Sequence, residues 1–207
     1  MNFNYFPSWS YLVLDFTKED LQPLLEEVEV IKTNPNNAIP FNHELIGQIK
    51  EEYELTHSVK YLNDLLMFGV SNYLSESKLF KHYTVLRNDS SISLGKTWVN
   101  IQKRYEFNPI HNHTGLLSFV IWLEVPYDME MEKQVHPGQQ SPLRLEGAFS
   151  FHHIDTMGEI STHTITIDKS MLYKCIIFPS KIFHSVNPFY STDGKRVSVS
   201  GNFYFDN

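Results

Sequence analysis

The amino-acid sequence predicts a single, mainly β domain whose strands are preceded by helices. Aromatic residues make up 14% of the 207 residues, with 15 Phe and 11 Tyr, and such side chains suit pleated, half-buried surfaces. Apolar residues alternate with polar ones from Leu79 onward, whereas before that point they recur at helical spacing. The length fits one domain. Residues 1–78 are therefore expected to form a helical support that packs on a β core of residues 79–207.

The first third is expected to hold one short strand, Tyr11–Phe16, and three helices. Thr17 is a suitable N-cap for the first helix because two acidic residues follow it, and acidic side chains are favoured in a first helical turn. The second helix is predicted over Asn42–Leu55, with Asn42 as its cap, and the third over Tyr61–Tyr73. Apolar residues recur every three or four positions in each helix, so one face of each should pack on the β core.

Seven strands are predicted in the remaining two thirds of the chain, separated by turn-forming clusters. They are Phe80–Leu86, Thr97–Tyr105, Leu116–Val125, Leu143–His153, Thr162–Ile167, Leu172–Phe178 and Lys195–Phe205. A series of short strands with turns between them predicts an all-β sandwich or barrel. The segment Tyr127–Ser141 is a long loop on this interpretation, and we expect it to cover a binding site as a lid.

Charge and composition exclude several classes of protein. Seventeen Lys and Arg against 24 Asp and Glu give a net charge of −7, which argues against a nucleic-acid partner. The single cysteine, Cys175, excludes a disulfide framework and a cysteine-based zinc site. The longest apolar stretch, Leu116–Val125, is about half of what a bilayer needs. We therefore expect a cytoplasmic protein with no membrane partner, for which a homodimer stays open.

A pair of histidines, His111 and His113, precedes the apolar strand at Leu116. Residues i and i+2 of an extended segment point to the same side, so both imidazoles could reach one metal ion. With 10 histidines in the chain, one such pair arises by chance about half the time, so for the pair taken alone a surface loop is the better explanation. His184, which follows a later strand and turn, makes a metal site the better hypothesis. His152 and His153 are adjacent and point to opposite faces of their strand, so we assign them to packing.

The last strand carries a polar face that includes an arginine. Alternation places five side chains on that face: Arg196, Ser198, Ser200, Asn202 and Tyr204. A buried arginine needs an anionic partner, and its guanidinium can bind a carboxylate through two hydrogen bonds, with Ser198 adding a hydroxyl. No Asp or Glu is an obvious partner in the sequence. A bound organic acid is therefore predicted.

Taken in order, these motifs resemble those of the Fe(II)/2-oxoglutarate-dependent oxygenases, particularly a branch of small oxygenases common in phages and marine bacteria. The resemblance extends from Thr97 to the C-terminus, whereas the helical first third carries none of its motifs. The residues that carry it are Trp98-x-Asn100, His111-x-His113, Ser118, Phe178-Pro179-Ser180, His184 and Arg196-x-Ser198.

The resemblance implies a double-stranded β-helix, a jelly-roll or cupin-like core with Fe(II) at its open end and 2-oxoglutarate as cosubstrate. His111, His113 and His184 would be the first, second and third metal ligands. Arg196 would bind the far carboxylate of 2-oxoglutarate with the help of Ser198. The cosubstrate pocket would also be lined by Asn100 and Gln102. The implied reaction is hydroxylation of an unactivated C–H bond in a protein residue or small molecule, with release of succinate and CO₂.

His113 departs from the commoner family pattern, in which a carboxylate occupies this position. Three neutral ligands leave the full +2 charge on the metal, and the 2-oxoglutarate dianion would offset it. The departure leaves open a three-histidine iron dioxygenase of the cupin type that uses no 2-oxoglutarate. A non-catalytic β-sandwich for binding or structure is the other alternative, because the aromatic composition suits it as well.

Overall fold

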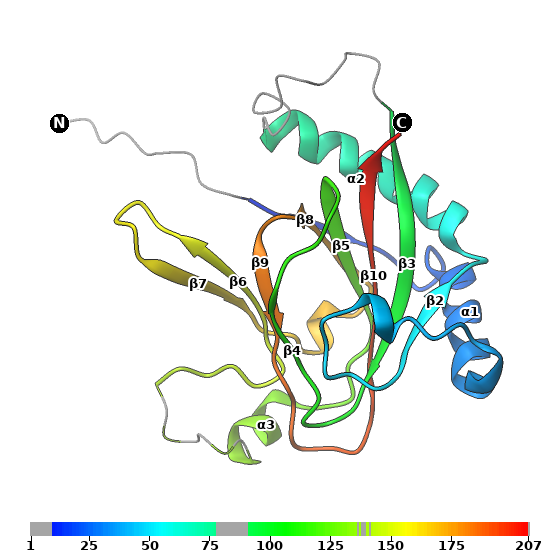
Figure 1. Cartoon of the computed structure of the whole chain (residues 1–207). Coiled ribbons are helices and arrows are strands. Elements are labelled where there is room, and N and C mark those ends of the chain that lie inside the picture. The colour runs from blue at the N-terminus through cyan, green and yellow to red at the C-terminus, as the bar shows by residue number, and fades with distance from the viewer. Residues whose placement is uncertain (1–9, 78–90, 136, 138–139, 141, 207) are drawn as a thin grey trace.

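The computed structural model describes residues 10–77, 91–135, 137, 140 and 142–206, which form two facing antiparallel sheets (Figure 1). The larger sheet has six strands in the order β1 (Leu12–Asp15), β8 (Lys174–Pro179), β5 (Leu117–Glu124), β10 (Arg196–Phe205), β3 (Ile92–Gln102) and β2 (Glu52–Leu55). The smaller sheet has the order β4 (Asn108–His111), β9 (Phe183–Val186), β6 (Phe149–Ile154) and β7 (Ile160–Ile165). This arrangement confirms the predicted double-stranded β-helix.

The two faces of β10 meet two different environments, as its alternating sequence predicts. Val197, Val199 and Phe203 belong to a core between the larger sheet and the helices. The opposite face, with Arg196 and Ser198, looks into the space between the two sheets. A second core fills part of that space with side chains from both sheets, among them Trp122, Phe149, Phe151, Ile176 and Phe178.

Two helices cover the outer face of the larger sheet, α1 (Gln22–Thr33) and α2 (Val59–Ser77) (Figure 1). The helix α2 confirms the third predicted helix. In contrast to the prediction, α1 begins at Gln22, because Thr17 caps a separate turn in front of it. In that turn the Asp20 N–H donates to Thr17 Oγ1 (3.1 Å).

The second predicted helix, Asn42–Leu55, is wrong. Only Asn42–Glu44 forms a single 3-10 turn, and Glu52–Leu55 is instead strand β2, paired with β3. The Asn42 side chain does not cap a helix: its amide donates to the Ile49 carbonyl oxygen (2.8 Å) and to Glu52 Oε2 (3.0 Å), which closes the segment into a loop. Pairing with the exposed edge of β3 outweighed the local helical periodicity.

The other differences are small. Sequence patterns missed β2, β4, β9 and the short helix α3 (Met129–Val135), each of seven residues or fewer. Six of the predicted strands are confirmed with shifted ends, and the seventh, Phe80–Leu86, lies outside the described residues. Cys175 is fully buried. None of the helices in the described part of the chain has both the length and the hydropathy needed to cross a membrane.

Candidate active site

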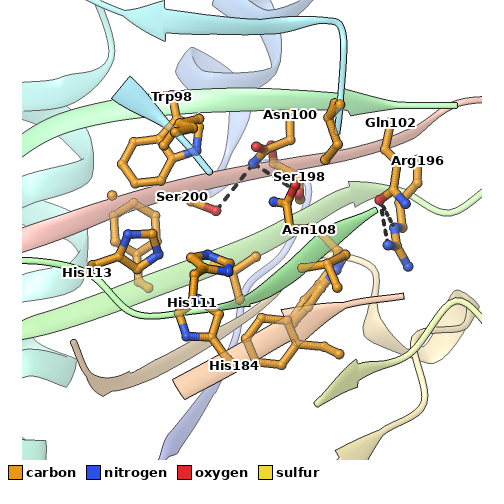
Figure 2. Close-up of a pocket in the computed structure, with 18 of the residues that line it drawn as sticks. Trp98, Asn100, Gln102, Asn108, His111, His113, His184, Arg196, Ser198 and Ser200 are labelled. Atoms are coloured by element: carbon orange, nitrogen blue, oxygen red, sulfur yellow. Dashed lines mark hydrogen bonds between the residues drawn. The ribbon is translucent and has the colours of Figure 1, made fainter. Parts of the chain in front are cut away.

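A cavity of about 50 Å³ lies between the sheets, and a ladder of paired residues on β3 and β10 forms one wall of it (Figure 2). Three residue pairs of this antiparallel ladder face the cavity: Arg196 with Gln102, Ser198 with Asn100, and Ser200 with Trp98. Cross-strand partners lie on the same face of a sheet. The four side chains that the sequence assigned to a cosubstrate pocket, at positions 100, 102, 196 and 198, therefore lie together.

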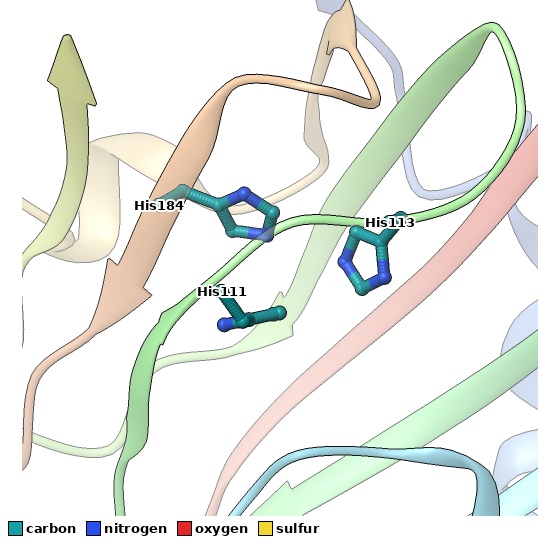
Figure 3. A group of neighbouring side chains, drawn as sticks. All are labelled: His111, His113 and His184. Atoms are coloured by element: carbon teal, nitrogen blue, oxygen red, sulfur yellow. The ribbon is translucent and has the colours of Figure 1, made fainter.

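The three predicted histidines come together at the other end of this cavity (Figure 3). His111 on β4 lies directly opposite His184 on β9. His113 follows in the loop after β4, where its backbone N–H donates to the Ser180 carbonyl oxygen (2.9 Å). One ring nitrogen from each of the three histidines lies within 4.8 Å of the others, although they come from two separate parts of the chain.

Hydrogen bonds fix the orientation of two of these rings. Nδ1 of His111 lies 2.7 Å from the Pro109 carbonyl oxygen, and Nδ1 of His184 lies 3.0 Å from that of Ile182. A carbonyl oxygen can only accept, so both Nδ1 atoms carry the proton and donate. Each Nε2 is then a free lone pair, which is the usual arrangement of a metal-binding histidine.

Burial keeps the three histidines neutral. Desolvation, with added repulsion from His111, lowers the pKa of His113 to about 3. Desolvation also lowers the pKa of His111, and it holds the pKa of His184 well below its usual range. A metal ion binds the neutral imidazole. The donor set therefore fits a divalent transition metal such as Fe(II).

Aromatic side chains pack around the histidines. The His184 ring stacks on Phe149, with ring centroids 5.4 Å apart, and also contacts Phe178. The His113 ring lies 5.7 Å from that of Trp98. These contacts restrict ring rotation and keep the site poor in water, which explains the large desolvation of the imidazoles.

Arg196 is only 2% exposed, and neutral groups accept hydrogen bonds from all five of its N–H groups. Gln102 Oε1 accepts from Nε (3.0 Å) and Nη2 (2.5 Å), and the Tyr127 hydroxyl accepts from Nη1 (2.9 Å). The carbonyl oxygens of Gly147 and Asn187 accept the other two N–H bonds. No carboxylate among the described residues forms an ion pair with Arg196. Its buried positive charge therefore favours an anion in the cavity.

The sequence prediction missed Asn108, which also lines the cavity. It stands three residues before His111, and on a regular strand these two side chains would face opposite ways. A register shift in β4 between the two residues removes this difference. Pro109 within the strand was the one available signal, because proline in a strand often marks a bulge.

An outer cleft of about 420 Å³ opens beside the histidines. It shares His111, His113 and Trp98 with the inner cavity. Part of its wall is formed by Phe41, Glu44, Leu45 and Ile46. In contrast, no described residue of the predicted lid, Tyr127–Ser141, lines either space. The carboxylate of Glu132 in α3 instead accepts hydrogen bonds from the backbone N–H groups of Tyr190 and Ser191, both at 2.8 Å.

Comparison with protein families gives one match to the part of the chain that forms this site. A family described as "Putative 2OG-Fe(II) oxygenase" matches residues 96–202, which include every cavity residue predicted from the sequence. No curated protein matches the chain.

Several solved structures are similar in fold. A prolyl-4-hydroxylase from Pseudomonas putida is 13% identical, with a TM-score of 0.55 over 97% of this chain and 95% of that one. A viral collagen prolyl hydroxylase from Paramecium Bursaria Chlorella virus-1, in complex with 2-oxoglutarate, is 11% identical, with a TM-score of 0.53 over 93% and 94%. The α-ketoglutarate-dependent epimerase SnoN from nogalamycin biosynthesis is 14% identical, with a TM-score of 0.54 over 94% and 77%. At these identities the likeness shows a shared fold.

Proposed function

Because the chain belongs to the family of Fe(II)- and 2-oxoglutarate-dependent oxygenases, we propose that it hydroxylates an unactivated C–H bond of a protein residue or small molecule. The reaction would release succinate and CO₂. One observation carries the proposal: a cluster of three neutral histidines lies at one end of a cavity, and a buried arginine with no carboxylate partner among the described residues lies at the other. A metal ion suits the first end and a carboxylate the second.

In this proposal His111, His113 and His184 hold Fe(II). When bound, the metal supplies the activation of O₂, which amino-acid side chains do not provide. The protein supplies three oriented ligands and leaves the remaining coordination positions open. The aromatic side chains around His184 and His113 keep bulk water away from the reacting atoms.

Arg196 binds the far carboxylate of 2-oxoglutarate, and Ser198 adds a hydroxyl donor. The five neutral hydrogen bonds of the guanidinium hold its charge in place before the cosubstrate enters. A carboxylate forms stronger, charge-assisted hydrogen bonds than an amide oxygen does. It can therefore replace Gln102 Oε1 as the acceptor for Nε and Nη2 of Arg196. Asn100 lies beside Ser198 and lines the same space.

The inner cavity has one wall that lies outside the regular elements. The wall contributed by Leu45, Ile46 and Ile49 belongs to an irregular segment outside every sheet and helix, so it can move at the lowest cost. The primary substrate would then reach the metal through the outer cleft. Two of the similar structures are prolyl hydroxylases, so prolyl peptides are the first substrates to test.

The test of this assignment compares two arginines. We expect Arg196→Met to weaken 2-oxoglutarate binding by about 100-fold, the value of the charge-assisted bonds it removes, and to leave metal affinity unchanged. Arg196→Lys keeps the charge without the planar fork and should give an intermediate loss. Arg104→Met is the control, because Arg104 pairs with Asp193 (2.9 Å) away from the cavity. The measurements are cosubstrate affinity under anaerobic conditions and succinate formation in air.

Equal cosubstrate affinity in wild type and Arg196→Met would overturn the assigned role of Arg196. Substrate oxidation without 2-oxoglutarate would favour the three-histidine dioxygenase of the cupin type instead. The product of the proposed reaction is a substrate that has gained one oxygen atom, which mass spectrometry detects. Three expectations from the sequence stay predictions: that the chain belongs to the phage and marine-bacterial branch, that it forms a single domain, and that it forms a homodimer.

A further inference from the structure

A β-bulge brings a second polar side chain of β4 into the cavity beside His111. Asn108 pairs with Val186 and His111 with His184, so three residue steps on β4 match two steps on β9. Bulges of this kind redirect side chains next to active sites. The outward side chain between them, Ile110, is 59% exposed. In Figure 2 Asn108 consequently lies between the histidines and Arg196, below Ser198.

Two neighbouring side chains, Asn108 and Glu52, each have one buried oxygen atom without a hydrogen-bond partner among the described residues. These atoms are Oδ1 of Asn108 and Oε1 of Glu52 on strand β2. Both lie next to Gly47, since a β-carbon at that position would come within 2.4 Å of the Asn108 oxygen and 3.4 Å of the Glu52 oxygen. Two acceptors facing the same small space cost free energy unless a proton lies between them.

Glu52 is well placed to supply that proton. The residue is 1% exposed, and its other carboxyl oxygen, Oε2, accepts from Asn42 Nδ2 (3.0 Å). Burial raises the pKa of Glu52 to about 7, with a smaller contribution from Glu106. With a proton on Oε1, Glu52 would be able to donate to Asn108 Oδ1, which would satisfy both oxygens. The amide of Asn108 would then be held with its N–H groups toward the cavity.

The cavity needs such donors when an anion binds. Displacing Gln102 frees only two N–H groups of Arg196, and the other three keep their neutral acceptors. Asn100 Nδ2 reaches its serine partners only at 3.4–3.5 Å. Asn108 lines the inner cavity and is not among the residues that line the outer cleft. The ligand it faces is therefore the one that lies between the histidines and Arg196.

We propose that Asn108 donates a side-chain hydrogen bond to the bound 2-oxoglutarate, and that Glu52 is the positioning residue that orients the Asn108 amide for it. This inference rests on the proposed function. It makes β2, a strand outside the part of the chain that the family match covers, a contributor to cosubstrate affinity.

The test measures 2-oxoglutarate binding by calorimetry on the Fe(II)-loaded protein without oxygen. Asn108→Ala should raise the dissociation constant about 10-fold or more, the usual effect of losing one hydrogen bond to a charged group. Asn108→Asp should raise it further, because a carboxylate repels the dianion. The control is Asn36→Ala, an exposed asparagine in the 3-10 turn Pro35–Asn37 that lines neither space, which should leave the constant unchanged.

Two variants of Glu52 separate positioning from a structural role. Glu52→Gln keeps a neutral donor for Asn108 and should bind 2-oxoglutarate within about threefold of wild type. Glu52→Leu removes the donor and should weaken binding as Asn108→Ala does. In steady-state kinetics both weakened variants should raise KM for 2-oxoglutarate and leave kcat and KM for the primary substrate unchanged. Thermal unfolding of each metal-free variant checks that it folds.

The outcomes distinguish the inference from the proposed function. If wild type binds 2-oxoglutarate and Asn108→Ala binds it equally well, Asn108 is not a binding residue and the inference alone fails. If Glu52→Gln weakens binding as much as Glu52→Leu, Glu52 does not act through its hydrogen bond. If wild type itself binds no 2-oxoglutarate, the proposed function fails and takes the inference with it.

Discussion

At the scale of single residues, the histidine cluster owes its metal-binding form to burial. Desolvation lowers the pKa of all three imidazoles, that of His113 to about 3. They therefore hold fewer protons at pH 6 than three histidines with the ordinary pKa, which are mostly protonated there. The neutral state of the cluster does not depend on a bound metal.

This neutrality predicts how many protons leave when the metal binds. At pH 6 three ordinary histidines would release about two protons on binding Fe(II), whereas the buried cluster should release fewer. Anaerobic calorimetry in two buffers that differ in ionisation enthalpy gives this number directly. Release of about two protons would show that the site is open to water before the metal binds.

Residue-scale patterns predicted part of the site. Alternation along the last strand correctly placed Arg196 and Ser198 on a face separate from Val197, because regular pleating decides that division. Asn108 escaped prediction because its orientation depends on a bulge, and a bulge depends on how β4 pairs with β9. The neutral hydrogen-bond acceptors of Arg196 could not be predicted either, because they come from residues far apart in the chain.

At the scale of elements, the contact between α2 and the larger sheet requires a small residue. Gly69 lies where the helix comes closest to the sheet: a β-carbon there would stand 2.5 Å from Leu14 Cδ1 and 3.1 Å from Ile177 Cδ1. These side chains belong to β1 and β8. The distance between helix and sheet is therefore set at this glycine.

We expect Gly69→Val to lower the free energy of unfolding by about 1–3 kcal/mol, the usual cost of overpacking a core. Ser71→Val, at an exposed position of the same helix, is the control for the lower helix propensity of a β-branched residue. Urea denaturation of both variants measures the difference. Equal stability of the two variants would mean that α2 can shift away from the sheet without loss.

The predicted elements failed where tertiary pairing competes with local pattern. Long, strongly periodic elements such as α2 and β10 were predicted from the sequence. The segment Asn42–Leu55 has helical spacing, yet its last four residues pair with β3 because that edge offers unpaired backbone groups. The strands β4 and β9 have four residues each, too few for alternation to identify.

At the scale of the whole molecule, one buried carboxyl group links stability to pH. The pKa of Glu52 rises from 4.5 to about 7, mainly by burial. Between these values the folded protein holds a proton that the unfolded chain has lost. This contribution to stability is complete below the unfolded pKa and is lost as pH rises through the folded one.

The free energy of unfolding of wild type should therefore fall relative to Glu52→Gln, by about 3 kcal/mol between pH 4.5 and pH 8. Chemical denaturation of the metal-free proteins at several pH values measures this. The variant carries the same histidines, so their titration cancels in the comparison. Parallel pH profiles of the two proteins would contradict the assigned protonation of Glu52.

The order of motifs along the chain predicted the overall architecture better than any single element did. A metal-binding pair, a later histidine and an arginine on the last strand imply a fold that brings three segments of the chain together, and the double-stranded β-helix does so. The sequence could not show that β1 and β2, from the supposedly helical first third, form both edges of the larger sheet. Edge positions depend on partners and not on local composition.

The central claim is that the three histidines hold Fe(II) and that 2-oxoglutarate binds to the same centre. Its most direct test is anaerobic visible spectroscopy while Fe(II) and then 2-oxoglutarate are added, because chelation of the cosubstrate to ferrous iron gives a weak charge-transfer band. The band should form in wild type and in His152→Ala, whose histidine bonds to Ser185 (2.9 Å) outside the cluster. It should be absent in His184→Ala. A band that persists in His184→Ala, or one that never forms in wild type after iron has bound, would contradict the account.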